Sequence, residues 1–180
     1  MVEALRPDRP RLFLRGFAPA DFGILASWFE NEAEARLWGG PLARFPVDRV
    51  QLAAMLAETL DPRPRRRCWS ALMGGELAGH AQAVRRDAGT MHLARIAVAP
   101  AWRRRGVGAA MVAAVIDEIL ADPEVNLVTL NVHLHNAGAR ALYCGLGFEP
   151  AGPAAAAHDD VPNEWQSEEL KLERMDWESR

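Results

Sequence analysis

Residues 96–109 read IAVAPAWRRRGVGA, and they are the most informative stretch of the chain. The first half is an apolar run that ends at Pro100, as a strand does before a loop. The second half passes through three arginines and two glycines into residues 107–120, an almost wholly apolar run of good helix formers. The stretch therefore predicts a strand, a short glycine-containing loop and a buried helix, in that order.

The loop between this strand and this helix is suited to a phosphate. The first turn of a helix has N–H groups without internal partners, and the helix dipole is positive there. Gly106 and Gly108 lack side chains that would block a close approach, and residues 103–105 add positive charge. We therefore expect a phosphate or pyrophosphate at this point. A Walker loop would need a lysine, and a Rossmann fingerprint has another spacing and follows the first strand. An ordinary helix start is the remaining alternative.

The segments around this unit predict a layered domain. Residues 68–73, 77–85 and 90–99 are strand-like runs with short glycine-containing breaks, which favours three antiparallel strands. Before them we expect a strand at 11–15, helices that begin at Pro19 and Pro46, and turns over 31–45. After the helix we expect a strand at 125–132, a helix at 136–144, a strand from Phe148, a loop over 151–163 and a strand at 165–175. The fold class is thus α/β or layered α+β, with a mostly antiparallel sheet.

Composition limits the class of protein. A chain of 180 residues with 49% hydrophobic and 25% charged residues suits one domain over 1–180, with 1–10 expected to be flexible. The net charge of −3 argues against nucleic-acid binding. No apolar run reaches the roughly 18 residues of a membrane span, and no secretory signal is visible. Cys68 and Cys144 have no metal or redox spacing, so we expect a cytoplasmic protein without a metal.

Two motifs give the sequence a family resemblance. Arg103, Gly106 and Gly108 fit the pattern Gln or Arg, two residues, Gly, one residue, Gly or Ala, and the strand before them fits apolar-Ala-Val-x-Pro. A second motif, N-x-x-A-x-x-L-Y-x-x-x-G-F, is met by Asn136, Ala139, Leu142, Tyr143, Gly147 and Phe148. With these motifs the chain resembles the GNAT superfamily of N-acetyltransferases. The resemblance implies acetyl-CoA as acyl donor and a mixed sheet, flanked by helices, that splays between two central strands.

The resemblance also implies which residues hold acetyl-CoA. The backbone of the strand would pair with the pantetheine arm, and a backbone N–H near Ile96 would face the thioester oxygen. Asn136 would lie near the arm as well as cap its helix. The full set of implied acetyl-CoA-binding residues is Ile96, Ala97, Val98, Arg103, Arg104, Arg105, Gly106, Val107, Gly108, Ala109 and Asn136.

Tyr143 and His92 are the candidate catalytic residues. The family places its motif tyrosine beside the sulfur, where Tyr143 could protonate the leaving thiolate; a core aromatic is the alternative. His92 stands where several family members carry a base, and strict alternation would put His92, Ala94 and Ile96 on one sheet face. An ordinary histidine pKa of about 6.5 would suit a base near neutrality. A hydrogen-bonded strand histidine is the alternative.

The resemblance predicts direct attack by the primary amine of a small molecule, which could be polyamine-, aminoglycoside- or amino-acid-like. A protein N-terminal acetyltransferase and a non-catalytic acyl-CoA-binding module are the alternatives, and a homodimer is common in the family. Several further groups each have a site interpretation beside a structural one. They are the carboxylates Glu30, Glu32 and Glu34, the aromatics Trp28, Trp38 and Phe45, the histidines His133 and His135, and residues 63–67, which could contact an adenosine 3′-phosphate.

Overall fold

The structure is a computed structural model that describes residues 12–40, 43–154 and 166–180. The expected flexible segment 1–10 and positions 155–163 of the expected loop lie outside these residues. No helix in the described part of the chain is long and apolar enough to cross a membrane.

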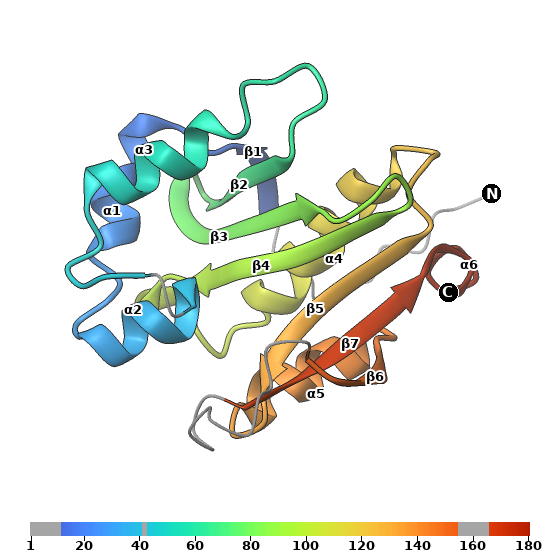
Figure 1. The fold of residues 1–180 in the computed structure, drawn as a ribbon. Helices are drawn as coiled ribbons and strands as arrows, with labels where there is room; N and C mark the ends of the chain where they lie inside the picture. The colour runs from blue at the N-terminus through green and yellow to red at the C-terminus, as the bar shows by residue number, and fades with distance from the viewer. Residues whose placement is uncertain (1–11, 41–42, 155–165) are drawn as a thin grey trace.

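Strands and helices follow one another along the chain in an order close to the expected one (Figure 1). The N-terminal half contains β1 (Leu12–Gly16), η1 (Pro19–Asp21), α1 (Phe22–Ala26), α2 (Glu32–Gly39), α3 (Arg49–Ala57), β2 (Arg66–Met73) and β3 (Glu76–Arg85). The C-terminal half contains β4 (Thr90–Val98), η2 (Pro100–Trp102), α4 (Val107–Leu120), β5 (Leu127–His133), α5 (Ala137–Gly145), β6 (Glu149–Pro153), β7 (Ser167–Glu173) and α6 (Arg174–Glu178).

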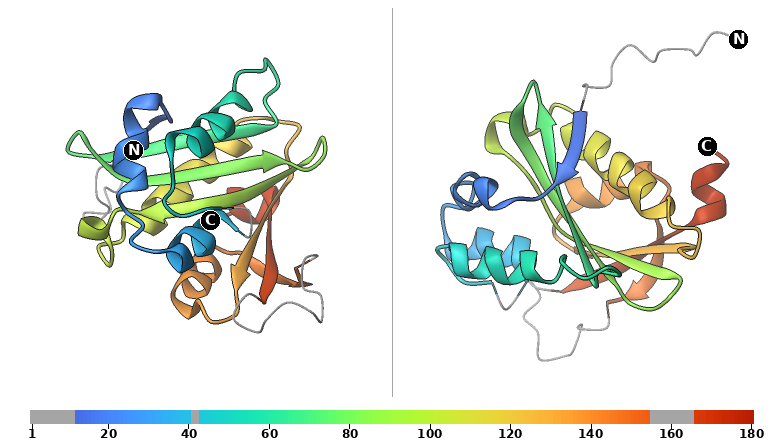
Figure 2. Two further views of the ribbon diagram at one scale, coloured as in Figure 1. Left: turned by 60° about the vertical axis from the view of Figure 1, so that its left-hand side comes forward. Right: turned by 90° about the horizontal axis from the view of Figure 1, so that it is seen from above.

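The strands form one sheet in the order β1-β2-β3-β4-β5-β7-β6. Neighbours are antiparallel except β4 and β5, which are parallel because α4 crosses between them. Helices α1 to α3 cover one face of the sheet, and α4 and α5 cover the other (Figure 2). The mixed, mostly antiparallel sheet flanked by helices is therefore confirmed.

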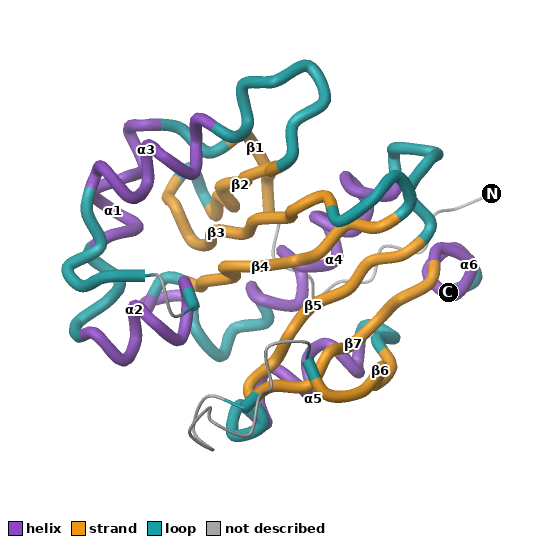
Figure 3. The backbone as a smooth tube through the Cα atoms, viewed as in Figure 1, coloured by secondary structure: helices purple, strands orange, loops and turns teal. Residues whose placement is uncertain are grey.

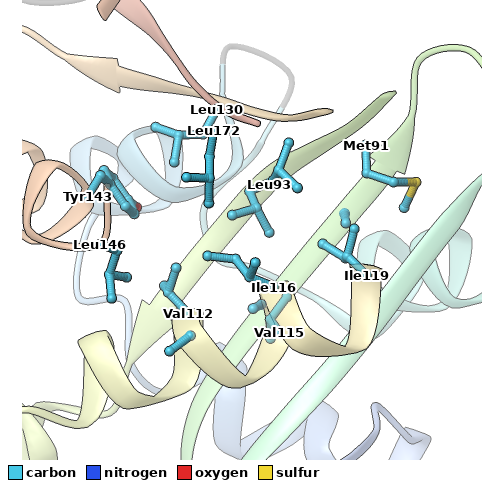
Figure 4. Close-up of a cluster of buried hydrophobic side chains, with 14 of the residues drawn as sticks. Met91, Leu93, Val112, Val115, Ile116, Ile119, Leu130, Tyr143, Leu146 and Leu172 are labelled. Atoms are coloured by element: carbon cyan, nitrogen blue, oxygen red, sulfur yellow. The ribbon is translucent and has the colours of Figure 1, made fainter. Parts of the chain in front are cut away.

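Helix α4 supplies the main core. Its residues Val112, Ile116 and Ile119 pack against Leu93 of β4 and Leu130 of β5 (Figure 4). Each such side chain contributes roughly 1.5–3 kcal/mol when fully buried. A second core lies under α1 to α3 on the opposite face. The sheet is thus held from both sides, which keeps β4 and β5 in place where they separate.

Strands β4 and β5 separate after four paired positions. Pairing runs from Thr90 opposite Leu127 to Leu93 opposite Leu130. Beyond that point β4 continues to Val98 without β5, and β5 continues to His133 beside β7 alone. We call this opening the splay; the two strands diverge toward α2 in Figure 3. The splay expected from the resemblance is confirmed.

A β-bulge in β4 changes which residues share a face. His80 lies opposite Ala97 and Gln82 lies opposite Ala94, so a single β3 residue faces both Arg95 and Ile96. Arg95 adopts a φ of 51°, which absorbs the extra residue. Ile96 therefore packs against the α4 core, while His92 faces the α2 side. The prediction that His92 and Ile96 share one face was wrong, because strict alternation assumes a strand without bulges.

Three segments differ from the expected elements. Helix α2 forms where turns were expected, because Asn31 caps it and the two glycines at 39–40 only end it. Strand β6 extends through Pro153, beyond the expected loop start at 151. The end of the expected last strand is α6, where Arg174 donates hydrogen bonds to the carbonyls of Leu120 and Asp122, at 2.9 and 2.7 Å.

Candidate active site

The loop before α4 presents unpaired backbone donors. Arg104 and Gly106 have φ values of 62° and 77°, and α4 begins at Val107. The N–H groups of residues 104–109 find no hydrogen-bond acceptor among the described residues, and residues 103–106 are exposed. A turn with alternating left-handed residues at a helix start forms an anion-binding concavity. The arrangement fits the diphosphate of a CoA thioester, and we call residues 103–109 the phosphate loop.

The phosphate loop is tied to the end of β4. Arg103 Nε donates to the Val98 carbonyl at 3.1 Å, and the Arg105 guanidinium lies 5.7 Å from the centre of the Trp102 ring. A Cβ at Gly108 would lie 3.2 Å from Leu142 Cδ1 and 3.5 Å from Val98 Cγ2. Gly108 therefore lets α4 approach β4 and α5 closely, in addition to leaving its amide open.

The edge of β4 along the splay has backbone groups available. Ala99 N–H donates to the Ala78 carbonyl of β3, at 2.9 Å. Alternation in an antiparallel ladder then turns the backbone groups of Ile96 and Val98 toward the splay. A hollow of about 300 Å³, which we call the loop-side hollow, lies against this edge. It is lined by Ile96, Ala97, Val98, Arg103 and Asn136 together with Phe29, Glu34, Leu37 and Trp38.

A smaller hollow of about 130 Å³, the splay hollow, lies between the separated strands and α5. Asn136 lines both hollows and caps α5, where its Oδ1 accepts from the Ala139 N–H at 3.1 Å. Tyr143 of α5 also lines the splay hollow, and its ring meets Phe148 edge-on at 5.9 Å. Burial raises the pKa of the Tyr143 phenol to about 12, so the group stays protonated near neutrality. Tyr143 is thus both a core aromatic and a wall of the site.

His92 lies on the α2 side of the sheet, in a third hollow of about 370 Å³ that we call the sheet-face hollow. Its Nδ1 shares a hydrogen bond with Thr129 Oγ1 at 2.8 Å. Burial, and to a lesser degree Arg86, lowers the pKa of His92 to about 4. The expectation of an ordinary pKa near 6.5 was therefore wrong; His92 is neutral near pH 7 and a weaker base than expected.

Comparison with known proteins identifies the family. Residues 25–148 match the profile of the acetyltransferase (GNAT) family. The chain belongs to the GNAT family. A spermidine N-acetyltransferase from Vibrio cholerae, solved with CoA and spermine, has a TM-score of 0.76 at 14% identity, covering 94% of this chain and 99% of that chain. AAC(6')-Ib, solved with ribostamycin and coenzyme A, has a TM-score of 0.73 at 22% identity, covering 93% and 96%. Both share the fold.

Membership makes the chain an acetyl-CoA-dependent N-acetyltransferase. The geometry brings most of the expected GNAT residues together around the splay. The phosphate loop lies at its mouth, Ile96 to Val98 form one edge, and Asn136 and Tyr143 line it from α5. His92 lies beyond the bulge in the neighbouring sheet-face hollow.

Some of the acidic and aromatic candidate residues of this GNAT chain line the hollows, and the others do not. Glu34 lines the loop-side hollow, whereas Glu32 forms an ion pair with Arg36 at 2.7 Å and Glu30 is exposed. Trp38 lines all three hollows. Trp28 is buried in the second core, and Phe45 is exposed.

The two histidines at and after the end of β5 also differ. His133 lines the splay and sheet-face hollows, and exposed His135 stacks on it at 5.5 Å. Within the described residues no three potential ligands group as a metal site would require.

Of residues 63–67, Arg66 lines the sheet-face hollow, whereas Arg63 and Arg67 lie away from it. Arg63 and Arg67 line a separate hollow beside Asp122, and Arg67 donates to the Glu118 carbonyl at 2.8 Å. The phosphate loop precedes the same helix, Val107–Leu120, whose last turn contains Glu118, about 17 Å along the axis from Val107. A contact of residues 63–67 with an adenosine 3′-phosphate or an acidic partner stays a prediction.

Some residues of the GNAT site were missed by sequence reasoning. The sheet-face hollow is also lined by Arg66, Arg95 and Asn131, which come from three different strands. Arg95 carried a signal, because it is a lone charge inside the apolar run 91–99. Arg66 carried none, since it belongs to a string of arginines that resembles a solvated loop.

Proposed function

We propose that this acetyltransferase transfers the acetyl group of acetyl-CoA to the primary amine of a small molecule, and that 1–180 act as one catalytic domain. The observation that carries the proposal is the splay, because the loop-side and sheet-face hollows each share lining residues with the splay hollow. An acyl donor and an amine can therefore meet there. The relatives solved with spermine and with ribostamycin support a small amine as acceptor.

In this proposal the chain holds the acyl donor through backbone groups. The phosphate loop binds the diphosphate, and the backbone of Ile96 and Val98 pairs with the pantetheine arm. An N–H near Ile96 would stabilise the oxyanion that forms when the amine nitrogen attacks the thioester carbon. Removal of one such donor typically costs about 10²–10³ in rate.

Two side chains would move the protons of the reaction. The new C–N bond forms as the C–S bond breaks, so the departing thiolate needs a proton and the amine must lose one. Tyr143 borders the splay as a protonated phenol and is the proposed donor to the sulfur. Neutral His92 borders the acceptor side and is the proposed acceptor of the amine proton, directly or through water.

Release of free CoA thiol tests this function. The chain is mixed with acetyl-CoA and an alkylamine, a polyamine, an aminoglycoside, an amino acid or a peptide with a free N-terminus. We expect thiol release with at least one small amine, and a fall in kcat of about 10²-fold or more in Tyr143→Phe.

Tyr143→Phe keeps the ring that packs on Phe148, so its melting temperature serves as the folding control. Release with the peptide alone would contradict the small-amine proposal in favour of protein N-terminal acetylation. Tight binding of acetyl-CoA without release over the whole panel would contradict catalysis. Unchanged kcat in Tyr143→Phe would remove the proton-donor role.

A further inference from the structure

The sheet-face hollow has a strongly positive lining. It is bordered by Arg66 of β2, Arg86 after β3 and Arg95 of β4, and none of its described lining residues is a carboxylate. It shares Trp38, Arg95 and other lining residues with the splay hollow, so the two are continuous. A ligand in the sheet-face hollow can therefore reach the splay.

Arg66 and Arg95 are held together by a neutral group. Gln82 Oε1 accepts from Arg66 Nη1 at 2.8 Å and lies 3.5 Å from Arg95 Nη1. Gln82 is fully buried, and the Arg66 side chain is only 13% exposed. An amide positions two guanidinium groups without cancelling their charge, so like charges remain close together in a partly dry place.

One of the two arginines has a carboxylate partner and the other has none among the described residues. Glu58 forms an ion pair with Arg66, with its oxygens 3.1 Å from Nε and 3.5 Å from Nη2, and the Glu58 side chain is 40% exposed. Arg95 forms no ion pair with any residue that the structure describes, and its contact with the Gly39 carbonyl is long, at 3.4 Å. Burial and the charge of Arg66 both lower the pKa of Arg95. Arg95 thus has donors and charge left for a ligand.

The backbone directs Arg95 into this hollow. In a regular strand Arg95 would share a face with Leu93, which packs in the α4 core. The bulge, with Arg95 at a φ of 51°, places its side chain on the α2 side, over Trp38 at 5.9 Å from the ring centre. A non-glycine residue in this conformation costs of order 1–3 kcal/mol, which other interactions must offset.

Buried neighbours orient Gln82 toward the arginines. Its Nε2 donates to His80 Nε2 at 2.9 Å and lies 3.3 Å from Met55 Sδ. Burial lowers the pKa of His80 to about 3, so His80 stays neutral and can accept this hydrogen bond. The amide oxygen of Gln82 is thereby left for Arg66 and Arg95. Core residues therefore hold the Arg66 and Arg95 guanidinium groups in position.

We propose that the acetyl acceptor carries a carboxylate beside its primary amine, and that Arg66 and Arg95 bind this carboxylate while the amine enters the splay. The inference rests on the small-amine function proposed above and narrows it to aminocarboxylates. Planar guanidinium groups suit a carboxylate, which can accept from both.

Matched acceptors test the inference. Glycine, 3-aminopropanoate and 4-aminobutyrate are compared with methylamine, ethylamine and propylamine, which lack only the carboxylate. We expect at least one aminocarboxylate to exceed its partner about 10- to 100-fold in kcat/KM, as hydrogen bonds to a charged group would give. Equal or better rates with all the alkylamines, or with a polyamine, would overturn the inference.

Substitution of the arginines locates the effect. Arg95→Gln should remove most of the preference, mainly through a higher KM for the aminocarboxylate, and should change the alkylamine rate far less. Arg95→Lys should keep part of the preference because it keeps the charge. Arg66→Gln is a second variant in case Arg95→Gln does not fold, as judged by thermal melting. Arg63→Gln removes an equal charge at the exposed far end and should leave the preference intact.

The two proposals fail in different ways. If no amine of either series releases CoA, the small-amine function is wrong and the inference falls with it. The other outcome is release of CoA at rates that depend neither on the acceptor's carboxylate nor on substitution of Arg95. In that case the small-amine function stands and the inference alone is wrong.

Discussion

His92 is almost sealed from water, and its surroundings set its chemistry. It is 6% exposed, bonded to Thr129 and near the positive charge of Arg86. Burial and the charge of Arg86 both favour the neutral imidazole. A base with a pKa of about 4 is almost fully unprotonated at pH 6 or above. The fraction of His92 that can accept a proton is therefore constant across the physiological pH range.

This predicts the shape of a pH profile. His92→Gln should lower kcat/KM by about 10²-fold at every pH from 6 to 9, since general-base catalysis contributes about that much at the low end of its range. The logarithmic profiles of the two proteins should therefore run parallel, and any rise with pH should come from the amine. The measurement is kcat/KM over pH 6–9 with one acceptor.

Exposed His135→Gln is the matched control and should leave the profile unchanged. An inflection near pH 6.5 that is present in the native chain and absent in His92→Gln would contradict the lowered pKa. Unaltered kcat/KM would assign His92 a purely structural role.

Among the elements, the phosphate loop depends on backbone conformation more than on side chains. Its donors converge because Arg104 and Gly106 are left-handed just before α4. Glycine adopts this region without strain, whereas a Cβ at Gly106 would strain it even though no other atom lies within 4 Å.

Gly106→Ala should therefore weaken acetyl-CoA binding. The strain of order 1 kcal/mol or more would be relieved by turning the amide away, so we expect Kd to rise about 10-fold. Calorimetric titration with acetyl-CoA measures this. Gly23→Ala in α1 also has open space around its Cβ but no positive φ, and its Kd should match the native value. An unchanged Kd for Gly106→Ala would contradict binding at the loop.

For the whole molecule, two buried histidines link stability to pH. Burial lowers the pKa of His80 to about 3 and that of His92 to about 4, from 6.5 in an unfolded chain. Because the unfolded chain binds the protons more readily, the stability is complete above pH 6.5. It is lost as the pH falls from 6.5 toward the folded values.

We expect the free energy of unfolding to drop between pH 7.5 and pH 5 by roughly 2 kcal/mol for each histidine. Urea unfolding at the two pH values measures the drop. His92→Gln should reduce it by about half, and the control His135→Gln should not alter it. Equal stability of the native chain at pH 7.5 and pH 5 would contradict both lowered pKa values.

A feature could be predicted from the sequence when its signal lies within one short segment of the chain. Helix α4 and the phosphate loop were predictable, because an apolar run, a glycine spacing and an arginine cluster all lie within residues 96–120. The role of Asn136 as a helix cap was predictable for the same reason. Helix α2 was not, because its glycines at 39–40 suggested turns and its cap at Asn31 was overlooked.

The chain's order of apolar runs and its two motifs specified a GNAT fold with a phosphate loop before a buried helix, since these signals act between residues close in sequence. The pairing of β3 with β4 determined how the side chains of the site are arranged. It sets the bulge that separates the faces of His92 and Ile96. It also brings Arg95 and Arg66 together on Gln82. Such register and burial depend on contacts between distant strands, and no spacing within one segment encodes them.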